Sequence, residues 1–189
     1  ILCWDGVVAA MGTDLAAEVD GARSAGADVH TLDANGSTVV PGLIDGHVHP
    51  IAGSVSAVPP GIGWTETYLQ AGVTTCVSAG ELTTPGFRAA GLTPRDATRL
   101  AANAAWTFAG MDSPPRVYAG ALLAVPGLRK ADFEEVANCG GKLLKYIYYP
   151  FADGWEREVR QYAEWAREVG LRTKLHAGGT SYQGHSVAA

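Results

Sequence analysis

Two histidines separated by a single residue are the strongest chemical signal in the sequence. His47 and His49 follow the apolar residues Leu43 and Ile44 and stand directly before Pro50. Alternate side chains of a strand share one face, so both imidazoles can offer a ring nitrogen to one metal ion at the end of a strand. Two hydrogen-bonded histidines at a sheet edge would give the same spacing, so the surrounding sequence has to decide between these interpretations.

Two later residues are further candidate ligands. Lys145 alternates with Leu143 and Ile147. Burial among such neighbours lowers the pKa of a lysine and leaves a neutral amine, which can capture carbon dioxide as a carbamate and so become an anionic oxygen ligand. A surface lysine or a structural ion pair is the alternative, and Lys142 is a poorer candidate because it lies at the strand start. His176 ends another strand-like segment, either as a ligand or as a packed core residue.

Alternating strand-like and helix-like segments would position these residues. Strands are predicted at 39–49, 73–79, 116–124, 142–148 and 171–176, and helices at 94–109, 131–138 and 155–169. Repeated βα units indicate a parallel sheet or barrel. A closed (β/α)8 barrel needs eight such units and about 250 residues, so we expect an α/β fold holding an incomplete barrel of about five units. An open doubly wound sheet is the alternative, but the Gly-x-Gly-x-x-Gly turn of dinucleotide folds is missing.

The first 40 residues have a different pattern, in which short apolar runs are separated by turn residues. The runs 1–4 and 7–11 flank Asp5-Gly6, and the runs 29–32 and 38–40 flank Asn35-Gly36. This pattern predicts small antiparallel strands rather than helices. We expect a small β-rich domain over 1–40 and the barrel portion over 41–189. Because the chain opens within a strand-like run and stops after a Gly-rich loop, we also expect both ends to be cut.

The segment Pro-Gly-Leu-Ile-Asp-Gly-His-Val-His, at 41–49, resembles the first-strand signature of the amidohydrolase superfamily. These are metal-dependent hydrolases built on a (β/α)8 barrel beside a small β-sandwich, part of which would correspond to residues 1–40. The resemblance implies that His47 and His49 bind the more buried of two divalent ions and that Asp45 shapes the strand end. It also implies that Lys145 bridges both ions as a carbamate and that His176 binds the second. Zinc is the expected metal, with iron or manganese as alternatives, and a metal-bound hydroxide is the expected nucleophile.

A narrower resemblance is to enamidase-like amidohydrolases and the related imidazolonepropionases. It rests on Ser78-Ala79-Gly80-Glu81, Thr84-Pro85-Gly86 and His176-Ala177-Gly178-Gly179-Thr180-Ser181. It implies hydrolysis of a C–N bond, that of a cyclic amide, with Glu81, Gly178, Gly179 and Thr180 contacting the substrate, although the glycines would equally make a tight turn. An imidazolonepropionase- or dipeptidase-type amidohydrolase is one alternative. A catalytically inactive barrel fragment or interaction module is the other.

The amino-acid composition of the chain limits the kinds of partner that we expect it to bind. The net charge is −5, with no basic run to neutralise phosphates, which argues against nucleic acid. No apolar run approaches the roughly 18 residues of a membrane span, so we expect no membrane partner. Three cysteines without metal-type spacing suit a reducing, cytoplasmic setting. We expect a small-molecule amide as substrate, a homo-oligomer in the complete protein and no activity in the 189-residue piece alone.

Overall fold

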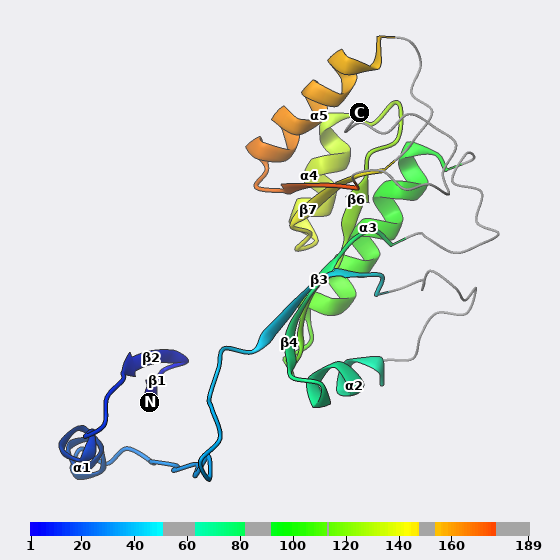
Figure 1. Ribbon diagram of the computed structural model, residues 1–189. Coiled ribbons are helices and arrows are strands. Elements are labelled where there is room, and N and C mark those ends of the chain that lie inside the picture. Colours follow the sequence, from blue (N-terminus) through cyan, green and yellow to red (C-terminus); the bar gives the residue numbers. More distant parts are fainter. Residues whose placement is uncertain (51–62, 82–91, 113, 148–153, 177–189) are drawn as a thin grey trace. The chain divides into compact units, whose positions relative to one another are not determined.

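The computed structural model describes residues 1–50, 63–81, 92–112, 114–147 and 154–176 (Figure 1). It divides into two compact units, Ile1–Pro41 and Gly42–Ala189.

The first unit begins with the expected hairpin. Strands β1 (Leu2–Trp4) and β2 (Val7–Ala10) pair antiparallel. They are joined at Asp5 and Gly6, both with positive φ, as a two-residue hairpin turn requires.

The rest of the first unit corrects the sequence prediction. Residues 16–24 form helix α1 (Ala16–Ser24), where no helix was expected, because a segment of Ala, Glu and Arg has high helix propensity. The second predicted hairpin is wrong, since 29–32 and 38–40 form no strand. Only its turn exists, closed by a hydrogen bond from the Ser37 N–H to the Ala34 carbonyl (2.8 Å). Leu32 is 94% exposed, so its side chain makes no packing contacts that would stabilise a strand there.

The described strands of the second unit form two parallel three-stranded sheets. The first has the order β3 (Leu43–Val48), β4 (Val73–Ser78), β5 (Arg116–Tyr118). The second has the order β6 (Ala121–Leu123), β7 (Leu143–Tyr146), β8 (Arg172–Leu175). Parallel pairing throughout both sheets confirms the predicted α/β class.

The predicted strand at 116–124 is in fact two strands that belong to different sheets. The break falls at Ala119 and Gly120, and Gly120 has a φ of +79°. A Cβ on Gly120 would lie 2.5 Å from both the Ala101 carbonyl oxygen and the Ala105 Cβ. Helix α3 (Pro94–Ala109) therefore passes so close to the bend that only glycine fits there.

The three predicted helices are confirmed as α3, α4 (Lys130–Asn138) and α5 (Trp155–Glu168). At the start of α3 the Thr93 hydroxyl accepts the Asp96 N–H and the Asp96 carboxylate accepts the Thr93 N–H, both at 3.2 Å. This reciprocal cap fixes the first turn. Helix α2 (Trp64–Gln70) was not predicted, because it is only seven residues long and has no capping side chain.

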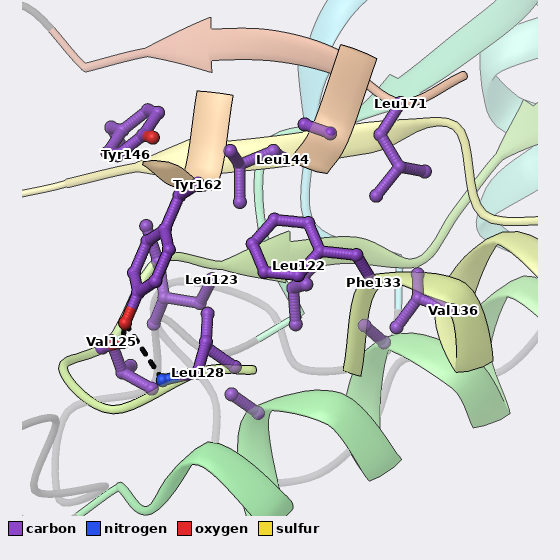
Figure 2. Packing of buried hydrophobic residues seen from close by; sticks show 14 of the residues in the cluster. Leu122, Leu123, Val125, Leu128, Phe133, Val136, Leu144, Tyr146, Tyr162 and Leu171 are labelled. Carbon is purple, nitrogen blue, oxygen red and sulfur yellow. Dashed lines mark hydrogen bonds between the residues drawn. The ribbon is translucent and has the colours of Figure 1, made fainter. Parts of the chain in front are cut away.

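The main core lies where α3, α4 and α5 pack beside β6 and β7 (Figure 2). Leu122 and Leu144 from the strands meet Phe133 of α4 and Tyr162 of α5, and all four are buried. The Tyr162 hydroxyl accepts the Leu128 N–H (2.8 Å), and two acceptors share its one proton, the Val125 carbonyl (3.0 Å) and the Glu158 carboxylate. The aromatic ring thus fills the core while its polar end ties α5 to the loop after β6.

Gly120→Ala should destabilise the protein more than the matched variant Gly127→Ala. Both positions have positive φ, which costs an alanine roughly 1–2 kcal/mol. At Gly127 the new Cβ meets only Pro94 Cγ, at an ordinary 3.6 Å. At Gly120 it overlaps α3, and such overpacking adds about 1–3 kcal/mol. Urea denaturation of the full-length protein measures the difference, and equal losses in the two variants would contradict the close approach.

Candidate functional site

Three of the predicted ligands lie together at the ends of parallel strands. His47 lies in β3, His49 directly follows it, and His176 directly follows β8. The ring centroids of His47 and His49 are 5.3 Å apart, and those of His47 and His176 are 5.8 Å apart. Strand alternation accounts for the first pair, because Val48 between them is buried on the other face. The His176 N–H is held by the Tyr146 carbonyl at 3.0 Å.

The rings of His47 and His49 favour the neutral form. Burial is the main cause that lowers the pKa of His47 and of His49, and the positive charge of Lys145 lowers both further. For His49 a hydrogen bond to the Gly80 carbonyl, at 2.8 Å from Nδ1, acts in the opposite direction. Neutral imidazole is the form that binds a metal ion.

Lys145 lies on β7, the central strand of its sheet, in register with Leu123 on one side and Lys174 on the other. Its side chain is 1% exposed, and Nζ makes no hydrogen bond within the described residues. Burial, followed by the charge of Lys174, lowers the pKa of Lys145 to about 8. A substantial fraction of its amine is therefore neutral near physiological pH. Lys142, at the start of the same segment, is exposed.

Lys174 is a component of the site that the sequence analysis missed. Its Nζ donates to the Gly46 carbonyl and to the Ser78 carbonyl (3.1 Å), so β8 is tied to the ends of β3 and β4. Burial lowers the pKa of Lys174, while the Asp45 carboxylate opposes that shift. The signal available in the sequence was its position two residues before His176, which puts both side chains on one face of the strand.

Asp45 lies in β3 close to the histidines. Its carboxylate accepts the backbone N–H of His47 at 2.8 Å and so holds the strand end locally. Burial raises the pKa of Tyr68 and of Cys76, and the negative charge of Asp45 raises both further.

Glu81 lies just beyond the end of β4 and is 3% exposed. Its Oε1 accepts hydrogen bonds from the Ser78 hydroxyl and the Gly120 N–H, both at 2.7 Å. The carboxylate thus contacts the bend between β5 and β6, and its role in substrate binding stays a prediction. Gly178, Gly179 and Thr180 lie outside the described residues.

No group of three or more His, Cys, Asp or Glu side chains in the described residues is arranged to hold a metal ion. A ligand set here would therefore need Lys145 alongside the histidines.

Among the helices that the structure describes, none has the length and apolar character of a membrane span.

Comparisons with known proteins show what the whole chain is similar to. No family model matches the chain. Over 191 aligned residues it is 31% identical to enamidase from Eubacterium barkeri, an alignment that covers 99% of this chain and 46% of that protein. The crystal structure of enamidase, reported as a new member of the amidohydrolase superfamily, matches with a TM-score of 0.63 and 29% identity, over 80% of this chain and 38% of that one. These two matches support an assignment of the chain to the amidohydrolase superfamily. It spans about half the length of the curated relative it matches.

Replacing Lys145 with Met should stabilise the metal-free protein at neutral pH. The folded-state pKa of Lys145, about 8, lies below the unfolded value of 10.5, so the unfolded chain binds more protons and stability rises with pH between these values. Lys145→Met removes this dependence and stabilises by up to about 3 kcal/mol below pH 8. Urea denaturation from pH 7 to 10 in carbon dioxide-free buffer measures it. Lys142→Met is the exposed control, and a gain there of the same size would contradict the burial argument.

Proposed function

We propose that the protein carrying this chain is a metal-dependent hydrolase of C–N bonds, with a cyclic amide as its small-molecule substrate. The observation that carries the proposal is the buried Lys145 amine, which has no hydrogen-bond partner in the described residues and whose positive charge lowers the pKa of both His47 and His49. Similarity to enamidase over nearly the whole chain supports the same reaction class. The proposed fold is about half of a (β/α)8 barrel over 41–189, with part of a small β-sandwich over 1–40.

The donor set fits two divalent ions, zinc first and iron or manganese as alternatives. His47 and His49 would hold one ion, His176 the other, and Lys145 would bridge them. Three imidazoles and an anionic oxygen group suit these metals. Divalent ions bound there would lower the pKa of a water molecule towards about 7 and polarise the scissile carbonyl.

Lys145 has to be modified before it can act as a ligand. Its neutral amine attacks the carbon of carbon dioxide, an N–C bond forms, and the nitrogen releases one proton to solvent. One C=O π bond of carbon dioxide opens in this step, and the product is a carbamate whose single negative charge is shared by its two oxygens. Lowering of the pKa of Lys145 to about 8 makes the reactive neutral amine available near neutral pH. The buried side chain would then carry one negative charge, which would compensate the charge of bound cations.

Other side chains would keep this arrangement in place. Asp45 holds the backbone at His47, and Lys174 ties β8 to the ends of β3 and β4. We further propose a cytoplasmic homo-oligomer as the complete protein. The free cysteines Cys3, Cys76 and Cys139 support a reducing compartment.

His47→Ala and His49→Ala should each remove about one equivalent of metal and nearly all hydrolysis of cyclic amides. Each change leaves one ion without a necessary protein ligand. Metal content of the purified full-length protein is measured by mass spectrometry, and ring opening by chromatography. His30→Ala, at an exposed histidine of the first unit, is the control. Two retained metals with full activity in His47→Ala would contradict the site, and a wild-type protein without metal would favour a non-enzymatic module.

Lys145→Ala should abolish occupancy of the pair of metal sites, and acetate or propionate should restore part of the activity. A small carboxylate can occupy the space of the missing carbamate and supply its two oxygens. Activity and metal stoichiometry are measured as the carboxylate concentration rises, with Lys142→Ala as the control that needs no rescue. If Lys145→Ala keeps two tightly bound ions, the bridging ligand is another residue.

A further inference from the structure

A chain of hydrogen bonds runs from the His49 ring to the bend between the two sheets. His49 Nδ1 lies 2.8 Å from the Gly80 carbonyl, and the Gly80 N–H donates to the Ser78 hydroxyl at 3.1 Å. The Ser78 hydroxyl in turn donates to Glu81 Oε1 at 2.7 Å, which also accepts the Gly120 N–H at 2.7 Å. Ser78, Glu81 and Gly120 lie at buried positions, so the bonds are shielded from water.

The Gly80 carbonyl determines which ring nitrogen of His49 carries no proton. A carbonyl oxygen only accepts hydrogen bonds, so this contact requires the proton on Nδ1. In the neutral ring Nε2 is then the atom with a free lone pair. The tautomer of His49 therefore depends on where the Gly80 carbonyl points.

Gly80 holds that direction through a backbone conformation that other residues rarely adopt. Its φ is +123°, and a Cβ there would meet only Lys145 Cγ, at 3.9 Å. Space therefore does not account for the conformation. The Ser78 hydroxyl holds the Gly80 N–H, and Glu81 orients that hydroxyl by accepting its proton.

We propose that Ser78 and Glu81 are positioning residues that fix the His49 tautomer, through Gly80, so that Nε2 faces the metal site. The inference rests on the proposed function for its metal, but the tautomer itself is a property of the metal-free chain. Glu81 acts from the bend at Gly120, so the same carboxylate sets both the sheet junction and the imidazole.

The test compares four variants of the full-length protein by 15N NMR of the His49 ring without metal and by zinc titration. Ser78→Ala and Glu81→Leu break the chain of bonds, so the Nε2-protonated tautomer should become populated and zinc affinity should fall about 10–100-fold. Glu81→Gln keeps an oxygen acceptor and should retain the wild-type tautomer. Thr98→Val removes another buried hydroxyl, bonded to the Pro94 carbonyl in α3, and should leave the His49 spectrum unchanged.

The outcomes separate this inference from the proposed function. An unchanged His49 tautomer in Ser78→Ala overturns the positioning role, whether or not zinc binds. An equal shift in Thr98→Val overturns it too, because general destabilisation would then explain the effect. If the tautomer responds as expected while the wild-type protein binds no zinc, the positioning role holds and the proposed function fails. Should Glu81→Leu not fold, Ser78→Ala and Glu81→Gln still decide.

Discussion

The hydrogen bond from the Gly120 N–H to Glu81 sets the point at which the chain leaves one sheet and enters the other. Only Ala119 and Gly120 separate β5, which pairs with β4, from β6, which pairs with β7. Because Glu81 lies three residues after the end of β4, its carboxylate holds the end of the first sheet against the start of the second. Lys145 on β7 is placed by pairing with β6, and His49 by the loop that contains Glu81. Both sides of the candidate site therefore depend on one buried carboxylate.

Charge is the second constraint on this arrangement. Lys145 and Lys174 lie side by side on paired strands, within the same electrostatic field as His47 and His49. Positive charges that lie close together in a partly buried site repel one another. This repulsion raises the free energy of each charged form, so the pKa of each group falls and the neutral form is favoured. Lys174 is compensated by two carbonyls and by Asp45, whereas the Lys145 amine makes no hydrogen bond in the described residues. That asymmetry makes Lys145 the lysine on which the site would gain most from an added anion.

The elements that the sequence predicted correctly are those with strong local signals. The cap at Thr93 and Pro94 marks α3, and the apolar stripe through Tyr162 and Ala166 marks α5. The run at 116–124 was predicted as one strand because its apolar pattern is continuous. The break at Gly120 depends on groups far away in the sequence, namely the Glu81 carboxylate and the closely packed helix α3. The failed hairpin at 29–40 shows the opposite limit, since turn residues and alternation do not make strands when no surface packs against them.

In the candidate site, too, the features that depend on neighbouring residues could be predicted, and those that depend on distant segments could not. His47 and His49 are identifiable from spacing, because alternation in a strand puts them on one face whatever surrounds them. The 5.8 Å approach of His176 to His47 depends instead on how the two sheets meet, 129 positions apart in the chain. Lys174 and Glu81 act by binding backbone groups of distant segments. Every residue has such groups, so the sequence does not show which residues are their partners. The residue types that can bind a metal ion are thus visible in the sequence. The orientation of their side chains depends on backbone contacts that form only when the chain folds.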